Sequence, residues 1–394
     1  MTTPADASRL NAAWTFPTAV RFGAGRIADL GRTGKRLGMA RPLVVSDPGL
    51  ASTSIPARAI ALLEDVGLAP ALFTDVKSNP SAVNVAAGAQ AFRNGGHDGV
   101  IALGGGSAMD AAKAISLAAG HDGAVLDFAH GGPRYKDIRG DAIAPLVAVP
   151  TTSGTGSEMG YAAVITDEAA NAKRILYHTG LLPRAVICDP ELVVGLPADL
   201  TAWTGMDAAV HCLEAYCARM FHPMCDGIAA EGLRIIRAWL PRAVRDGGDV
   251  EARAQMMAAA AMGAVAFNKG LGAVHALSHA IGARFDSHHG LTNAVVLPYV
   301  LAHNRLAIES RLEGLATYMG MTKRGFAGLM DWTLNTRAAF AIPHTVAGLG
   351  VTEADLDALA ETAAADVTAR ENPVPVDAKA LRGILAEALA GRIG

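Results

Sequence analysis

Five short apolar segments recur through the first half of this 394-residue chain, and three of them run into stretches with helical periodicity. The apolar segments are PLVVSD (42–47), ALFTDV (71–76), GVIALGGGS (99–107), PLVAVPTT (145–152) and AVICDP (185–190). The helical stretches cover residues 55–67, 81–95 and 107–119. Strands that are apolar throughout must be buried on both faces. Their alternation with helices therefore predicts an α/β fold, a parallel sheet with helices on both sides.

The second half of the chain has a different sequence pattern, in which alanine, leucine, methionine and charged residues recur at helical spacing. Such patterns predict an all-helical domain, with helices over 201–219, 226–239, 251–267, 273–284, 306–319 and 376–391. Two prolines in DPELVVGLPADL place the boundary near residues 190–198. We therefore expect an α/β domain over 1–195 and a helical domain over 196–394. A polar turn at Asp167–Asn171 predicts a hairpin in YAAVITDEAANAKRILYH.

Composition excludes several classes of partner. A net charge of −3 gives no electrostatic reason to bind nucleic acid or an anionic membrane. The longest uncharged run, Ser287 to Asn304, contains three histidines, two asparagines, a glycine and a proline, so we do not expect it to cross a membrane. MTTPADASRL has neither a basic nor an apolar signal region. The four cysteines form no CxxC pair, which favours a reducing, cytoplasmic setting.

A glycine-rich turn in GVIALGGGSAMDAAKAIS joins the third apolar segment to a helix. Without side chains, three successive glycines let backbone N–H groups approach a phosphate, and the helix dipole favours the anion. Ser107 and Asp110 have the spacing of a capping box, with an acid shorter than the usual glutamate. The pattern is not GxGxxG, so a plain structural turn stays open as an alternative.

Two further segments have chemistry that suits a nucleotide. Asp47 ends an earlier strand, where a carboxylate can accept hydrogen bonds from a ribose and repel a 2′-phosphate; a helix cap is the alternative. VPTTSGTGSE (149–158) has five hydroxyl side chains and two glycines after a strand, and these suit phosphate or ribose contacts. A turn rich in serine and threonine is the alternative there.

A metal site is predicted from residues in three separate segments. Asp207 and His211 stand at i and i+4 in TGMDAAVHCLEAYCA, so both side chains project from one helix face. His275 and His279 have the same spacing on another helix, and His289 follows ten residues later. Each group alone is more often structural, but together a carboxylate and several neutral imidazoles suit Fe(II) or Zn(II).

Four of these motifs occur in the order and spacing of one enzyme family. With VIALGGGSAMDAAK, VPTTSGTGSE, GMDAAVHCLEAY and GLGAVHALSHAIGARFDSHHG, the chain resembles the iron-containing (group III) alcohol dehydrogenases over nearly its whole length. The resemblance implies a Rossmann-like dinucleotide-binding domain, a helical metal-binding domain and an active site between them. It implies interconversion of small alcohols with aldehydes or ketones by a cytoplasmic homodimer, with NAD as cofactor and Fe(II), or else Zn(II), as metal.

The resemblance also implies roles for individual residues. The four metal ligands would be Asp207, His211, His275 and His289. His279 would lie near the nicotinamide as a proton relay while hydride passes from the alcohol to the cofactor. The cofactor contacts would be Asp47, Asn79, Gly105, Gly106, Ser107, Thr151, Thr152, Lys173 and Leu192.

Some positions depart from the family's pattern. His288 stands where the family usually has proline before the last ligand, and it has no family role. Lys269 replaces the usual asparagine of a Ser-Asn pair; it would either meet an anionic substrate group or be a solvated surface lysine. The substrate stays open. A zinc-dependent polyol dehydrogenase of the glycerol type is the alternative within the superfamily. A metal-dependent hydrolase would leave the glycine-rich turn and Asp47 unexplained.

Overall fold

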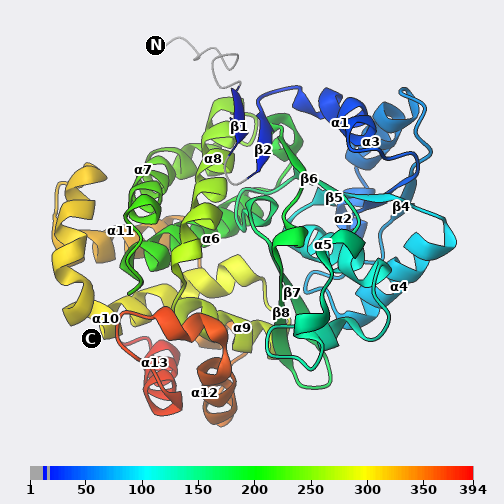
Figure 1. The fold of residues 1–394 in the computed structure, drawn as a ribbon. Coiled ribbons are helices and arrows are strands. Elements are labelled where there is room, and N and C mark those ends of the chain that lie inside the picture. Colours follow the sequence, from blue (N-terminus) through cyan, green and yellow to red (C-terminus); the bar gives the residue numbers. More distant parts are fainter. Residues whose placement is uncertain (1–11, 16–17, 394) are drawn as a thin grey trace, which may run out of the picture. The chain divides into compact units, whose positions relative to one another are not determined.

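The computed structural model describes residues 12–15 and 18–393, and the chain divides into two compact units (Figure 1). The first unit comprises residues up to 196 together with 246–257, and the second comprises 197–245 and 258–394. The signal-peptide prediction concerns residues 1–10, which lie outside the described residues. Over the described ranges, no single helix has the length and apolar character to cross a membrane. One strongly bent pair, Val250–Lys269 with Ala273–Phe285, meets that test by length and composition alone.

A seven-stranded sheet forms the centre of the first unit, in the order β1-β2-β9-β6-β5-β3-β4. Its strands are β1 (Ala12–Thr15), β2 (Ala19–Phe22), β3 (Pro42–Val45), β4 (Ala71–Phe73), β5 (Gly99–Gly104), β6 (Leu146–Pro150) and β9 (Ala185–Cys188). β1 runs antiparallel to β2, and all the other pairs are parallel. The predicted parallel sheet is confirmed. A separate hairpin of β7 (Ala162–Asp167) and β8 (Ala172–Tyr177) confirms the predicted turn.

Helices cover both faces of the sheet. The first-unit helices are α1 (Leu30–Arg36), α2 (Pro48–Ala51), α3 (Ser54–Glu64), α4 (Ala82–Asn94) and α5 (Gly106–Ala119). On one face, Ile101 and Leu103 of β5 join a buried apolar cluster with Leu30 of α1 and Leu63 of α3. Because successive strand residues point to opposite faces, the alternate side chains meet α5, which packs against β3, β5 and β6.

The strand order contains a topological switch point between β3 and β5. From β3 the chain first crosses to β4 on one side, and then returns to β5 on the other side of β3. In open α/β sheets, ligands bind outside the carboxyl ends of the strands at such a point. Asp47 follows β3, and the glycine-rich turn follows β5, so both flank this position.

A buried lysine ties α5 to the loop after β6. The Lys113 ammonium donates to the Ser157 carbonyl oxygen at 2.6 Å, to Ser157 Oγ at 2.8 Å and to the Ala162 carbonyl oxygen at 2.8 Å. Asp110, one helical turn earlier, accepts from Ser157 Oγ at 2.7 Å and from the Val164 backbone N–H at 3.0 Å. The capping-box prediction for Ser107 and Asp110 is therefore wrong, because this carboxylate binds partners beyond the helix and Gly105 is the N-cap.

Burial shifts the pKa values of Lys113, Asp110 and the nearby Glu158. It lowers the pKa of Lys113 to about 8, against the attraction of Asp110 and Glu158. It raises the pKa of Glu158 to about 7, and that of Asp110 above its ordinary value, in both cases against the pull of Lys113. Three acceptors around Lys113 match the three N–H donors of an ammonium. The lysine is thus charged at neutral pH and compensates the buried carboxyls.

The second unit is all-helical, as predicted. Its helices are α6 (Ala198–Cys217), α7 (Pro223–Arg245), α9 (Ala273–Phe285), α10 (His289–Tyr318), α11 (Gly325–Ala339), α12 (Leu356–Ala365) and α13 (Ala378–Ala390). α8 (Val250–Ala266) begins in the first unit and ends in the second. The prediction that the helix before α11 starts at residue 306 is wrong, because α10 starts at His289. Residues 292–301 are buried all round, so no amphipathic pattern marks them as helical.

Candidate functional site

The glycine-rich turn and Asp47 lie side by side at the switch point. Gly104 has φ +152°, and a Cβ there would stand 3.2 Å from Asp47 Oδ2 and 2.7 Å from the Ala108 side chain. Asp47 Oδ1 accepts the Leu50 N–H at 2.9 Å and so caps α2. One carboxylate oxygen therefore serves the helix cap, while the other faces the turn. The two interpretations of Asp47 are compatible.

The next two glycines pack against the hydroxyl-rich loop. A Cβ on Gly105 would meet Thr152 Cγ2 at 3.0 Å, and one on Gly106 would meet Thr155 Cγ2 at 2.5 Å. The backbone after β5 therefore lies against the threonine side chains after β6, with no room for a Cβ between them. Thr155 was not among the predicted contacts, although it belongs to the same VPTTSGTGSE motif.

The other predicted cofactor residues have varied surroundings. Ser107 Oγ donates to the Ser78 carbonyl oxygen, next to Asn79. Thr151 is buried, and its N–H donates to the Gly104 carbonyl oxygen at 2.9 Å. Lys173 lies on β8 and pairs in register with Thr166. Leu192 lies in the short helix η8 (Pro190–Val193) and belongs to the apolar cluster under the sheet, which gives it a packing role.

In the second unit, four of the predicted histidine and carboxylate side chains converge. Asp207, His211, His275 and His289 each offer one ligand atom, and these four atoms all lie within 4.8 Å of one another. Asp207 Oδ1 lies 3.6 Å from His289 Nε2 and 4.0 Å from His211 Nδ1. The rings of His211 and His275 stack at 4.6 Å between centroids. His279 is not a member of this group.

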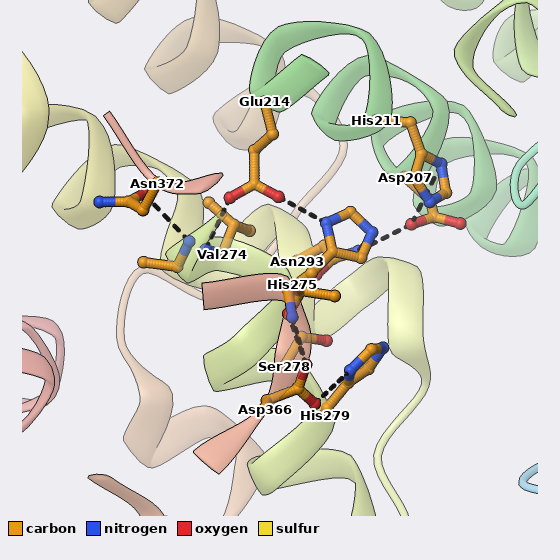
Figure 2. Close-up of polar contacts among 12 residues, drawn as sticks. Asp207, His211, Glu214, Val274, His275, Ser278, His279, Asn293, Asp366 and Asn372 are labelled. Carbon is orange, nitrogen blue, oxygen red and sulfur yellow. Dashed lines mark hydrogen bonds and ion pairs between the residues drawn. The ribbon is translucent and has the colours of Figure 1, made fainter. Parts of the chain in front are cut away.

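α6 supplies three of the side chains around this cluster. Asp207, His211 and Glu214 stand at i, i+4 and i+7, so all three project from one face of the helix (Figure 2). Glu214 Oε2 lies 2.6 Å from His275 Nδ1, and Glu214 Oε1 accepts the Val274 N–H at 2.8 Å. Glu214 was not among the predicted site residues, although its spacing in DAAVHCLE continues the same face.

His279 has a carboxylate partner of its own. Its Nδ1 lies 2.8 Å from Asp366 Oδ2, and the other oxygen of Asp366 accepts the Thr368 N–H at 2.8 Å and its hydroxyl at 2.7 Å. Burial alone would raise the pKa of Asp366, but His279 and Thr368 bring it down to about 2. An aspartate 87 residues away gives no signal in sequence spacing.

Asn293 is the polar residue most closely placed among the four ligand atoms. Its Nδ2 donates to Asp207 Oδ1 at 2.7 Å and lies 3.1 Å from His289 Nε2 and 3.4 Å from His275 Nε2. The side chain is fully buried, and its Oδ1 has no hydrogen-bond partner. The Nε2 atoms of His275 and His289 therefore both face this amide.

His288 has a structural role that the sequence left open. It is the N-cap of α10, where its Nδ1 accepts the Leu291 N–H at 3.3 Å, and its ring packs on Trp203 at 5.1 Å between centroids. Position 290, after His289, requires glycine because a Cβ there would stand 2.4 Å from the Trp203 carbonyl oxygen. The first turn of α10 therefore lies directly on α6, which brings His289 to Asp207.

Lys269 is buried between α6 and α7. It is 1% exposed, and its Nζ donates to Asp226 Oδ1 at 2.5 Å and to the Tyr216 carbonyl oxygen at 3.0 Å. The solvated-surface interpretation of Lys269 is therefore wrong, and its ammonium is held by acceptors within the protein. The ammonium ties the C-terminal end of α6 to the N-terminal turn of α7.

Comparison with known proteins covers both units. The family model described as "Iron-containing alcohol dehydrogenase" matches residues 17–190, and the model described as "Fe-containing alcohol dehydrogenase family, C-terminal" matches residues 201–389. The 4-hydroxybutyrate dehydrogenase of Cupriavidus necator is 38% identical, over 95% of this chain and 99% of its own. The NAD-dependent methanol dehydrogenase of Bacillus methanolicus is 35% identical, with the same two coverages. The crystal structure of a 1,3-propanediol oxidoreductase superposes with a TM-score of 0.88 at 32% identity, covering 96% of this chain and 99% of that one.

Proposed function

The chain belongs to the iron-containing alcohol dehydrogenase family, and we propose that it oxidises a small alcohol, or reduces the matching aldehyde or ketone, with NAD and a divalent metal. The observation that carries this proposal is the convergence of Asp207, His211, His275 and His289 in the second unit. Fe(II) is the metal that the family name implies, and Zn(II) suits the same donors.

The donor set fits such an ion on chemical grounds. One carboxylate and three imidazoles are hard-to-borderline ligands, and none of the four free, buried cysteines is among them. Glu214 and Ser278 lie at the Nδ1 atoms of His275 and His289, at 2.6 and 3.1 Å, so the Nε2 atoms of both rings are directed at the cluster. When bound, the ion would polarise the alcohol oxygen and favour the loss of its proton.

The first unit supports the nucleotide half of the proposal. A dinucleotide at the switch point would have its phosphates at Gly105 and Gly106, whose approach to Thr152 and Thr155 leaves no room for side chains. Asp47, at the end of β3, would accept the ribose hydroxyls, which favours NAD over its 2′-phosphorylated form. A metal-dependent hydrolase would not require a dinucleotide-binding site.

The test of the proposed function uses purified protein reconstituted anaerobically with Fe(II) or, separately, with Zn(II). We expect NAD reduction with at least one short-chain alcohol or diol, and loss of that activity after chelation. We also expect NADH to bind in a fluorescence titration without metal, because the nucleotide residues belong to the other unit. Failure to bind NADH would overturn the proposal and favour hydrolase chemistry.

His279→Ala is expected to lower turnover by about 10²-fold or more, because an imidazole next to the ligand cluster can relay the alcohol proton. Asp366 fixes the ring through Nδ1 and leaves Nε2 for this exchange. Metal content, measured by atomic emission, should stay at the wild-type level.

His303→Ala, an exposed histidine on α10, is the matched control and should keep full turnover. If His279→Ala loses the metal instead, His279 is a ligand and the relay assignment fails.

The substrate, the cytoplasmic location and the homodimer stay predictions. The named relatives act on 4-hydroxybutyrate, methanol and 1,3-propanediol, which are short molecules with a primary hydroxyl group. We propose a substrate of the same size class. A reducing location is supported by four cysteines that are all free and buried.

A further inference from the structure

We propose that Glu214 is the positioning residue that sets the metal affinity of this site, by fixing the proton of His275 on Nδ1. The inference rests on the metal centre of the proposed function. The donors and acceptors that carry it lie at the start of α9 (Figure 2).

Both oxygens of the Glu214 carboxylate have a donor in contact. The Val274 N–H can only donate, and it takes Oε1 at 2.8 Å. The other oxygen, Oε2, lies 2.6 Å from His275 Nδ1. An ionised carboxylate only accepts, so the imidazole must carry its proton on Nδ1. The ring's other nitrogen, Nε2, is then left as a lone pair, and it is the atom that lies 3.4 Å from Asn293 Nδ2 within the ligand cluster.

The local backbone is shaped to admit this carboxylate. α9 has no cap from its own side chains, and Gly272 is its N-cap. A Cβ on Gly272 would stand 2.8 Å from Glu214 Oε1 and 2.8 Å from Asn372 Oδ1. Asn372 Oδ1 accepts the Ala273 N–H at 3.1 Å. Side chains from two distant segments therefore cap α9, and one of them also holds the ligand histidine.

Glutamine at position 214 cannot reproduce this arrangement. Its side chain has one oxygen and one NH₂ group, whereas the Val274 N–H and a ligating His275 both need an acceptor. If the oxygen faces Val274, the NH₂ group faces Nδ1, and the proton of His275 moves to Nε2, where it blocks the ligand atom. If the amide is turned round, NH₂ meets N–H at Val274. Either orientation weakens the site.

Glu214→Gln is therefore expected to bind Co(II) about 10- to 100-fold more weakly than wild type, as measured by competition with a chelator through the visible absorption of the Co(II)-loaded protein. Asp366→Asn is the matched control. It removes a carboxylate from Nδ1 of the neighbouring His279, which is outside the ligand cluster, and should leave Co(II) affinity within about twofold.

Equal affinities of Glu214→Gln and wild type would overturn the inference, and so would equal weakening in both variants, which would indicate a general charge effect. If wild type itself fails to bind Co(II), the proposed metal centre fails as well, so the two failures are distinguishable. If the glutamine variant does not fold, an NMR measurement on the wild-type protein still tests the inference. In metal-free protein labelled with ¹⁵N-histidine, the His275 shifts should show a protonated Nδ1 and an unprotonated Nε2, and the opposite tautomer would overturn the inference.

Discussion

Asp207→Ala is expected to lose nearly all bound metal and to lower kcat/KM by about 10³-fold or more. Asp207 is 2% exposed and is the one carboxylate among the four ligand residues. Its Oδ1 lies close to both His289 Nε2 and the Asn293 amide, so its removal takes away the negative charge that offsets the cation. Metal content by atomic emission and steady-state kinetics with NAD measure the two effects.

Asp226→Ala is a control for this result in the same unit. Asp226 is a carboxylate near the end of α6, but its partners are Lys269 and Arg311, and it is outside the ligand cluster. This variant should be less stable and yet retain its metal. If Asp207→Ala retains its metal stoichiometrically, the ligand assignment is wrong.

Lys113→Met has the second largest expected effect, and it concerns folding. Removing the ammonium leaves Asp110 and Glu158 buried without their cation and leaves the Ser157 and Ala162 carbonyl oxygens without a donor. The three hydrogen bonds of Lys113 are lost, and a buried acceptor left unsatisfied costs about 1–3 kcal/mol, so we expect a loss of about 3–5 kcal/mol in the free energy of unfolding. For a unit of this size, that corresponds to a fall in Tm of about 10 °C, measurable by calorimetry.

Two comparisons separate this effect from a general loss of charge. Lys35→Met removes an exposed lysine from α1 and should change Tm by no more than about 1 °C. The double variant Asp110→Asn with Lys113→Met removes a charge of each sign and should recover part of the loss. If Lys113→Met alone is as stable as wild type, the cluster does not stabilise the first unit.

Local patterns in the sequence were sufficient to predict the parallel sheet and to identify the four residues that converge in the second unit. β3, β5, β6 and β9 are apolar throughout, which is the pattern of a parallel sheet covered on both faces. The i, i+4 spacing of Asp207 with His211 places two candidate ligands on one helix face without any tertiary information. The family's motifs predicted His289 rather than His288, and His289 is the histidine that lies with Asp207, His211 and His275. Gly290 lets the first turn of α10 pack on α6.

The groups that hold those residues in place depend on tertiary packing and were not predicted. Asp366 reaches His279 from a segment 87 residues away, and no periodicity links them. Lys269 lies beside glycines and was expected near solvent or substrate, yet Asp226 and the end of α6 enclose it. The N-terminal half of α10 was missed because it is buried on every side and contains Pro298, so it has neither an amphipathic stripe nor a helix-forming composition.

The division of α8 between the two units has a consequence for how such a chain can be shortened or recombined. Arg253 belongs to the first unit and donates to the carbonyl oxygens of Gly247 and Leu196. Its segment, 246–257, nevertheless follows 49 residues of the second unit, 197–245, along the chain. A protein ending at residue 196 would expose the surface that Arg253 covers. Exchange of nucleotide-binding halves between relatives therefore requires two crossovers around 246–257 in addition to the one near 197.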